Sequence, residues 1–127
     1  MESYSEIILD HAEHPRNHGE LADANATGYQ MNPVCGDTLA LALRIEGGSI
    51  AEARFLAEGC TASVAVSSLI TEMVTGLSLK DALELTHDDV SEAAGGLPAS
   101  KLHSAALVID TLRRAIGGYQ DSAASTT

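Results

Sequence analysis

Hydrophobic and polar residues alternate over two adjoining segments in the middle of the chain, 38–46 and 51–58, which the turn residues 47–49 separate. A period of two is typical of a half-buried strand, and a short glycine-containing turn between two such strands predicts a hairpin. A further short strand at 26–31 completes a predicted three-stranded antiparallel sheet with one polar face. The alternating apolar positions are Leu39, Leu41, Leu43 and Ile45 in the first segment, and Ala51, Ala53, Phe55 and Ala57 in the second.

After residue 60 the apolar residues recur every three or four positions, which predicts helices. One helix is expected over 62–73, with Gly76 at the position of a C-cap glycine. A last helix is expected over 102–116, and the pair 117–118 (Gly-Gly) is expected to end it. Because a run of strands precedes a run of helices, the pattern predicts an α+β fold with helices packed on one face of the sheet.

Three capping-box patterns, in which a serine or threonine precedes an acidic residue by three positions, predict further helix starts. Pro15 ends the first of these helices, because a proline disfavours the α conformation in the residue before it. We expect a single domain over residues 1–127, with frayed ends at 1–3 and 119–127. The three patterns are Ser3 with Glu6, Ser78 with Asp81, and Thr86 with Asp89, and the first helix places Tyr4, Ile7, Ile8 and His11 on one face.

Composition and charge narrow the function classes. The chain has 127 residues, of which 45% are hydrophobic, so it is long and apolar enough to bury a core. A formal net charge of −11 argues against nucleic-acid binding, which depends on Lys and Arg neutralising phosphates. The acidic surface suits a basic protein partner or a cationic ligand, or serves solubility alone. No apolar run approaches the roughly 20 residues of a membrane span, and no basic leader is visible, so we expect a cytoplasmic protein.

The two cysteines, Cys35 and Cys60, lie in different settings. In a reducing compartment such cysteines are free, structural or metal-binding more often than paired. Cys35 and Asp37 are two residues apart in a predicted loop, so both side chains can reach one point outside the sheet; a tight turn around a partly buried cysteine is the alternative. Cys60 falls at a helix N-terminus, where free N–H groups favour a thiolate and hence a metal ligand or nucleophile.

The start of the last predicted helix carries further polar groups. His103 offers an imidazole to a metal, although a lone histidine on a helix is more often solvated, and Lys101 could stabilise a thiolate or sulfide. Because Leu102 continues the apolar stripe, we expect His103 and Ser104 to turn toward the edge of the core. A second group of histidines lacks the spacing of a metalloprotease motif, and we interpret His11 as a packing residue. That group is His11, His14 and His18.

Five segments taken together resemble the IscU/NifU N-terminal family of iron–sulfur cluster assembly scaffolds, in unbroken order from about Tyr4 to Ile116. The opening stretch resembles DHxxxPRNxG, residues 32–37 are similar to NPxCGD, and 59–63 resemble the second-cysteine helix. Residues 76–82 resemble GxSLxxA, and 97–104 resemble LPPVKxHCS, although its last cysteine is replaced by Ser104 and the chaperone-read LPPVK becomes Leu-Pro-Ala-Ser-Lys. The resemblance implies the IscU/NifU N-terminal (SufE-like) fold.

The resemblance also implies a ligand set: Cys35 and Cys60 match two family cysteines, Asp37 an aspartate that favours cluster release, and His103 a ligand histidine. It implies a non-enzymatic scaffold or carrier for iron or a [2Fe–2S] or [4Fe–4S] cluster, monomeric or homo-oligomeric. Implied partners are a cysteine desulfurase, an Hsp70-type chaperone and apo-protein clients. Because serine is a poor ligand for such clusters, we expect a purified sample to hold one Zn²⁺ or Fe²⁺ on an S₂NO donor set, or no metal, more readily than a stable cluster.

Two alternatives to the scaffold remain at this point. The first is a degenerate metal-binding paralogue, with zinc, which docks on the desulfurase and regulates it without building clusters. The second is a zinc-dependent sulfurtransferase partner of the SufU branch. That branch carries an insertion after the second-cysteine helix and keeps all three cysteines, whereas the segment 76–97 is short here and Ser104 stands at the third cysteine position.

Overall fold

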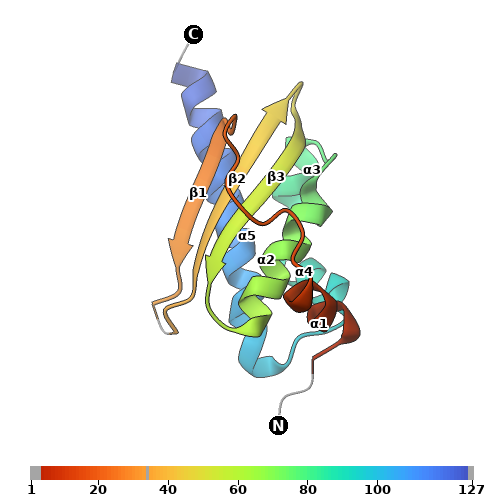
Figure 1. Cartoon of the computed structure of the whole chain (residues 1–127). Coiled ribbons are helices and arrows are strands. Elements are labelled where there is room, and N and C mark those ends of the chain that lie inside the picture. Colours follow the sequence, from red (N-terminus) through yellow and green to blue (C-terminus); the bar gives the residue numbers. More distant parts are fainter. Residues whose placement is uncertain (1–3, 34, 126–127) are drawn as a thin grey trace.

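A computed structural model describes residues 4–33 and 35–125, with side chains described as far as Asp121. It has the predicted α+β order, in which a helix precedes a run of strands and further helices follow (Figure 1). The elements are α1 (Glu6–Glu13), β1 (Ala26–Met31), β2 (Thr38–Glu46), β3 (Ser49–Glu58), α2 (Thr61–Val74), α3 (Leu79–Glu84), α4 (His87–Ala93), the 3₁₀ turn η1 (Ala99–Lys101) and α5 (Leu102–Ser125).

The three strands form an antiparallel sheet in the order β1-β2-β3, as the alternation predicted. The apolar side chains of β2 are buried at every second position. In β3 the expected inward position of Ala51 is wrong: Ala51 is exposed and Ile50 is fully buried. The register between β2 and β3 shifts at Arg44 and Ile45, and such a bulge changes which residues of the hairpin end face the core.

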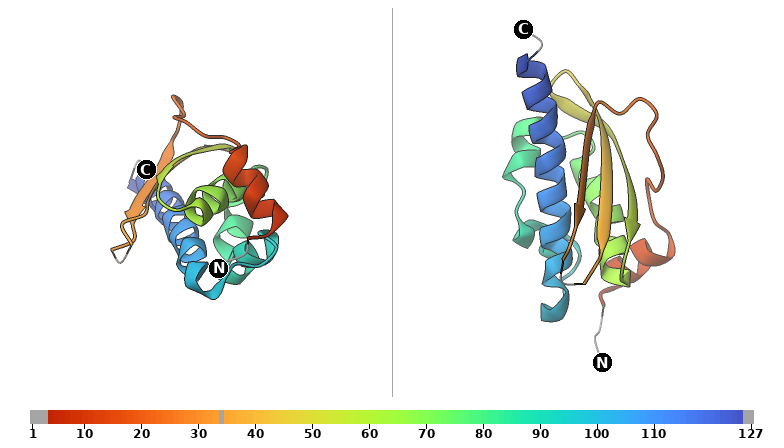
Figure 2. Two further views of the ribbon diagram at one scale, coloured as in Figure 1. Left: turned by 60° about the horizontal axis from the view of Figure 1, so that its bottom comes forward. Right: turned by 90° about the vertical axis from the view of Figure 1, so that its left-hand side faces the viewer.

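Helices α2 and α5 cover one face of the sheet, and α3 and α4 lie beyond them (Figures 1 and 2). This confirms the prediction of helices packed on one face. The segment between α1 and β1 crosses the opposite face of the sheet (Figure 2). There the backbone of Asn17 and Gly19 pairs with Phe55, at N–O distances of 3.0 and 2.8 Å, so this segment also covers part of the edge of β3.

The first helix begins later than predicted. Its N-cap is Ser5, whose side chain accepts a hydrogen bond from the Ile8 amide, so the expected cap at Ser3, which lies outside the described residues, is wrong. Ile8 and His11 face the core as expected, but Ile7 is 42% exposed. The cap at Ser78 accepts from the Asp81 amide, and the Thr86–Asp89 capping box is complete in both directions.

The last helix does not end at the glycine pair. It runs through Gly117 and Gly118 to Ser125, so the predicted stop at the glycine pair is wrong. The expected fraying from residue 119 stays a prediction. Neither glycine adopts a positive φ, and Tyr119 beyond them packs partly against the core. Glycine weakens a helix interior by about 1 kcal/mol without forbidding it, and tertiary packing outweighs that penalty here. The ends 1–3 and 126–127 lie outside the described residues.

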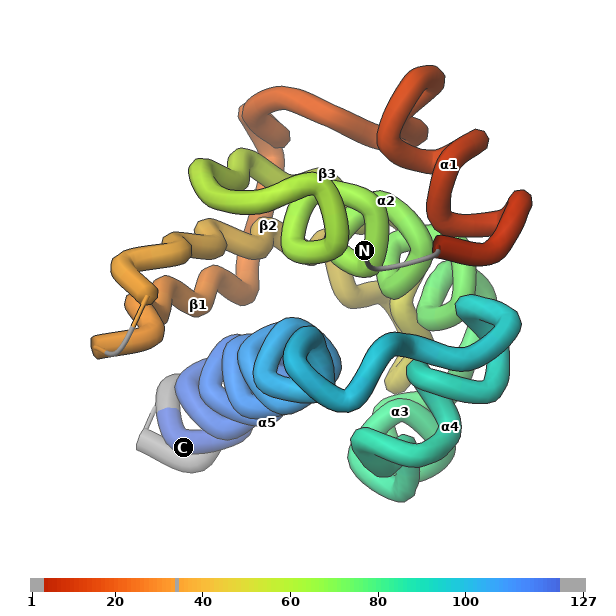
Figure 3. The backbone as a smooth tube through the Cα atoms, turned by 90° about the horizontal axis from the view of Figure 1, so that it is seen from below, coloured from red at the N-terminus to blue at the C-terminus, as the bar shows by residue number. Residues whose placement is uncertain are grey.

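The chain arrangement gathers three segments at one end of the molecule. The β1–β2 loop, the N-terminus of α2 and the start of α5 lie at the lower end in Figure 1, and Figure 3 views this end directly.

Within the described residues, no helix is both long and apolar enough to cross a bilayer.

Substitution of Gly28 tests the close approach of α5 to β1. A Cβ atom at Gly28 would lie 2.6 Å from the Thr111 carbonyl oxygen and 3.2 Å from Ala115 Cβ. We expect Gly28→Ala to lower the free energy of unfolding by about 1–3 kcal/mol, because the backbone of α5 must shift. Gly118→Ala is the control: it meets open space in a helix and should raise stability by about 0.5–1 kcal/mol. Urea unfolding measures both, and equal stability of the two variants would contradict the close approach.

Protonation of His11 should lower the free energy of unfolding as the pH falls. Burial lowers the pKa of His11 below its ordinary value, and the Arg16 charge acts in the same direction, against Glu72 and Asp10. Its Nδ1 lies 2.8 Å from the Ser68 hydroxyl. Well above about pH 6.5 His11 is neutral in both the folded and the unfolded state. As the pH falls, the unfolded chain takes up the proton first, so the free energy of unfolding decreases until the pH has passed below the folded pKa. Urea unfolding between pH 7.5 and 5.5 should show a smaller loss for His11→Asn than for the wild type, and equal losses would contradict this.

Candidate metal centre

The hairpin loop between β1 and β2 presents Cys35 and Asp37 in opposite environments. Backbone hydrogen bonds of 2.8 Å from the Gly36 amide to the Asn32 carbonyl, and from the Asn32 amide to the Asp37 carbonyl, close the loop. Gly36 adopts a φ of +79°, a conformation that glycine takes without steric cost. Cys35 is therefore exposed at the tip, while Asp37 is buried at 5% exposure.

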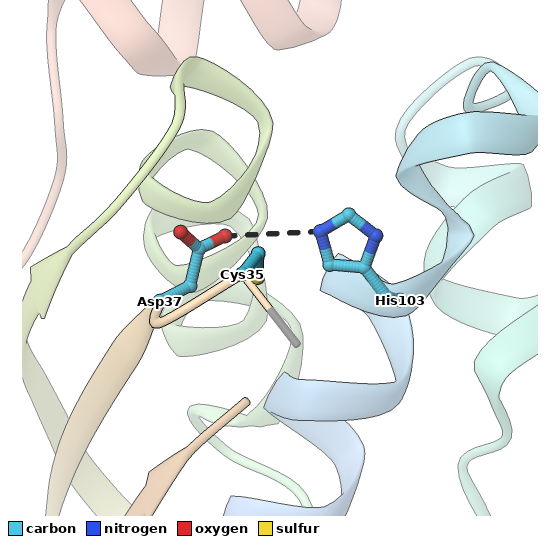
Figure 4. A group of neighbouring side chains, drawn as sticks. All are labelled: Cys35, Asp37 and His103. Atoms are coloured by element: carbon cyan, nitrogen blue, oxygen red, sulfur yellow. Dashed lines mark ion pairs between the residues drawn. The ribbon is translucent and has the colours of Figure 1, made fainter. Parts of the chain in front are cut away.

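Cys35, Asp37 and His103 converge on one point. Each offers one ligand atom, and the three atoms all lie within 4.8 Å of one another. Figure 4 shows the two loop residues facing His103 of α5, with the ion pair between Asp37 Oδ2 and His103 Nε2, which are 3.8 Å apart. Cys35 and Asp37 therefore do reach one point, as inferred from the sequence. A thiol, a carboxylate and an imidazole are donors that Zn²⁺ and Fe²⁺ accept.

Cys60 joins this group through Asp37. It is the N-cap of α2, as expected, and its side chain makes no capping hydrogen bond. Its Sγ lies 3.6 Å from Asp37 Oδ2 and 3.5 Å from Ser63 Oγ. Cys60 is half-buried and lies outside the three-residue group described above, so the predicted four-residue ligand set is only partly gathered.

Asp37 is held in its buried position by its neighbours. The Ser63 hydroxyl donates to Asp37 Oδ2, and a Cβ atom at Gly59 would lie only 2.5 Å from Oδ1. Burial alone would raise the pKa of Asp37, but hydrogen bonds from Ser63, Cys35 and Cys60 outweigh it and lower the pKa below the ordinary value. The carboxylate is therefore ionised at neutral pH, which is the form that binds a cation.

His103 presents a ring nitrogen to the site that makes no hydrogen bond within the described residues. Its Nε2 is buried and has no hydrogen-bond partner among the described residues, and Asp37 Oδ2 at 3.8 Å is too distant for a hydrogen bond. A buried polar atom without a hydrogen-bond partner is uncommon in native structures. Its position opposite a carboxylate and a thiol fits a site that a cation completes.

Ser104 and Leu102 occupy the reverse of their expected positions. Leu102 is 49% exposed, whereas Ser104 is fully buried, so the inference that Ser104 turns to the edge of the core is wrong. Helix α5 packs against the sheet on one side and α2 and α4 on another, and the buried arc is therefore wider than the single stripe read from periodicity. Ser104 Oγ lies 3.1 Å from Ser63 Oγ. Lys101, half-buried, ends η1 beside the site, and its role toward a thiolate stays a prediction.

Sequence reasoning missed Ser63. It lies three residues after Cys60 on α2, is 1% exposed, and contacts Asp37, Cys60 and Ser104. A serine amid small apolar residues on a buried helix face is the available signal, because a buried hydroxyl needs a partner.

The histidines near the N-terminus do not form a site. His11 is buried against Ser68, as the packing interpretation held, while His14 and His18 are exposed. The ring of His18 makes an edge contact with Phe55, at 5.3 Å between centroids.

Comparison with known proteins places the chain in a family. The family model described as "NifU-like N terminal domain" matches residues 3–126. The chain is 43% identical over 116 residues to the iron–sulfur cluster assembly scaffold protein IscU 1 of Archaeoglobus fulgidus, covering 91% of this chain and 76% of that protein. It is 44% identical over 118 residues to the scaffold protein IscU of Aquifex aeolicus, covering 91% and 75%.

A solved structure agrees with the fold. The crystal structure of a nitrogen-fixing NifU-like protein (N-terminal) from Brucella abortus superposes with a TM-score of 0.75 at 20% identity, covering 92% of this chain and 94% of that one. The predicted fold and the resemblance read from the five segments are therefore confirmed. The chain belongs to the NifU-like N-terminal domain family.

Proposed function

We propose that this chain is an iron–sulfur cluster assembly scaffold, which holds iron or a cluster as cargo on Cys35, Asp37, Cys60 and His103. The observation that carries the proposal is the convergence of Cys35, Asp37 and His103 at the end of the fold where α2 begins with Cys60. Family membership and the names of the relatives support the same function.

The donor set suits a weakly held cargo. Iron–sulfur clusters are held mainly by thiolates, and the whole sequence contains two cysteines. Asp37 and His103 supply the remaining donors, which are harder and favour a single Fe²⁺ or Zn²⁺ over a stable cluster, so a cluster assembled here is expected to be labile. A site with two thiolates, one of them exposed, binds its cargo less firmly than a site closed by four thiolates, which fits a protein that passes its cargo on.

The proposed setting is the cytoplasm, and the proposed role is that of a carrier and not of an enzyme that turns over substrate. A cysteine desulfurase is the proposed sulfur source, with an Hsp70-type chaperone and apo-protein clients as further partners. The net charge of −11 is compatible with partners that present a basic surface. The alternative is a zinc-binding relative that docks on the desulfurase without building clusters. The presence of only two cysteines in the sequence favours this alternative.

Anaerobic reconstitution separates the two functions. We expect the purified chain, given ferrous iron, cysteine and a desulfurase, to develop the visible absorbance of an iron–sulfur cluster with bound iron and sulfide. Cys35→Ala and Cys60→Ala should each lose it, because a single thiolate remains. Absorbance and metal content are the measurements. One zinc per chain with no cluster chromophore, in the wild type, would sink the scaffold function in favour of the alternative.

A third thiol should stabilise the cargo. Ser104 stands where the family resemblance expects a cysteine, and its hydroxyl reaches the Asp37 side of the site through Ser63. We expect Ser104→Cys to retain its reconstituted cluster several-fold longer than the wild type under a chelator challenge, because thiolate replaces hydroxyl.

Ser67→Cys is the matched control for that thiol. Ser67 is also fully buried and lies on α2, one turn after Ser63. Its hydroxyl donates to the Ser63 carbonyl and not to a residue of the site. Its cluster lifetime should equal that of the wild type. A similar gain in both variants, or in neither, would show that position 104 does not limit the cluster.

A further inference from the structure

Two buried hydroxyls connect α2 to α5 behind the metal centre. Ser63 is 1% exposed and Ser104 is fully buried, and their oxygens are 3.1 Å apart. Ser63 also contacts the buried carboxylate of Asp37 and the Sγ of Cys60. These hydroxyls are buried, and each has the other within hydrogen-bond distance.

The number of protons fixes the direction of these hydrogen bonds. A hydroxyl has one proton to donate and can accept two further bonds, whereas an ionised carboxylate only accepts. Because the Ser63 proton is given to Asp37 Oδ2, the contact between Ser63 and Ser104 must be donated by Ser104. The result is a one-way relay from Ser104 to Ser63 to Asp37, in which each bond strengthens the next.

The opposite side of Asp37 is closed by backbone. Gly59 lies so near that a Cβ atom there would fall 2.5 Å from Oδ1 and 2.6 Å from Cγ. The carboxylate is thus confined between Gly59 and the Ser63 hydroxyl, with Cys60 Sγ at 3.6 Å and His103 Nε2 at 3.8 Å from Oδ2. The Ser63 hydroxyl shares Asp37 with the thiols of Cys35 and Cys60 and the Cys60 backbone amide, and it is the hydroxyl that donates to the carboxylate from α2.

We propose that Ser63 and Ser104 are positioning residues of the metal centre: their relay aims the Asp37 carboxylate at the bound cation. This inference rests on the proposed function, because it takes the centre to bind iron or another divalent ion. Ser104 thereby has a role of its own at the position where the family resemblance expects a thiol. Ser104 does not bind the cation itself; through Ser63 it supports the Asp37 carboxylate, which does.

Cobalt binding tests the relay without any assembly activity. Co²⁺ is titrated into the purified chain against a chelator, and its visible bands report both affinity and ligand geometry. Loss of a hydrogen-bond partner behind a metal ligand typically costs about 10- to 100-fold in affinity, and we expect Ser63→Ala to weaken Co²⁺ by that factor. Ser104→Ala should weaken it less, because Ser63 still donates to Asp37. The sulfur-to-cobalt band should persist in both variants, since the cysteines are intact.

Ser67→Ala is the matched control, because it removes a fully buried serine hydroxyl from the same helix without touching Asp37. It should bind Co²⁺ with wild-type affinity and an unchanged spectrum. Circular dichroism checks that each variant is folded, and affinities are compared at a temperature at which all of them are.

A double-mutant cycle with Asp37→Ala separates positioning from a general loss of stability. If Ser63 acts through Asp37, then Ser63→Ala in the Asp37→Ala background changes Co²⁺ affinity no further. An equal loss in both backgrounds, or wild-type affinity in Ser63→Ala, overturns the relay while leaving the metal centre standing. A wild-type chain that binds no Co²⁺ overturns the proposed centre, and the relay with it.

Discussion

A carboxylate removed from water must be surrounded by hydrogen-bond donors, and the lower end of this molecule is organised around that requirement at Asp37. The side chain is 5% exposed, and its donors come from parts of the chain far apart in sequence. Ser63 and Cys60 approach from α2, Cys35 from its own loop, and His103 faces it from α5. The loop, the helix N-terminus and the last helix therefore meet where one charge has to be satisfied.

The fold delivers these segments together through its layers. A hairpin places Asp37 directly before β2, and the chain leaves β3 opposite it, since Thr38 pairs with Glu58 two residues before Cys60. Helix α5 then lies close against β1, with its backbone near Gly28, and so starts beside the same end of the sheet. The packing of α5 on β1 thus accompanies the placement of the β1–β2 loop and His103 at the same end of the molecule.

Ser104 stands where the family resemblance expects a cysteine, and this bears on how the proposed cargo is held. With two thiols, the centre depends more on oxygen and nitrogen donors than a cluster site made of cysteines does. Two serines behind Asp37 are consistent with that shift, because they act on the carboxylate and not on a sulfur. In the proposed relay the Asp37 carboxylate is supported by one serine on α2 and one on α5, and sequence reasoning missed the serine on α2.

Local periodicity was enough to predict the strands, most helices and the two cysteine settings, because alternation, capping and turn residues act over a few positions. The five motif segments, taken together and in order, were likewise sufficient for the family, which the comparisons confirmed. Packing decided the rest: the bulge that buries Ile50, the passage of α5 through Gly117, and the burial of Ser104 with Leu102 exposed. The contact between Ser63 and Ser104 joins residues 41 positions apart, and only the docking of α2 on α5 brings such hydroxyls within reach.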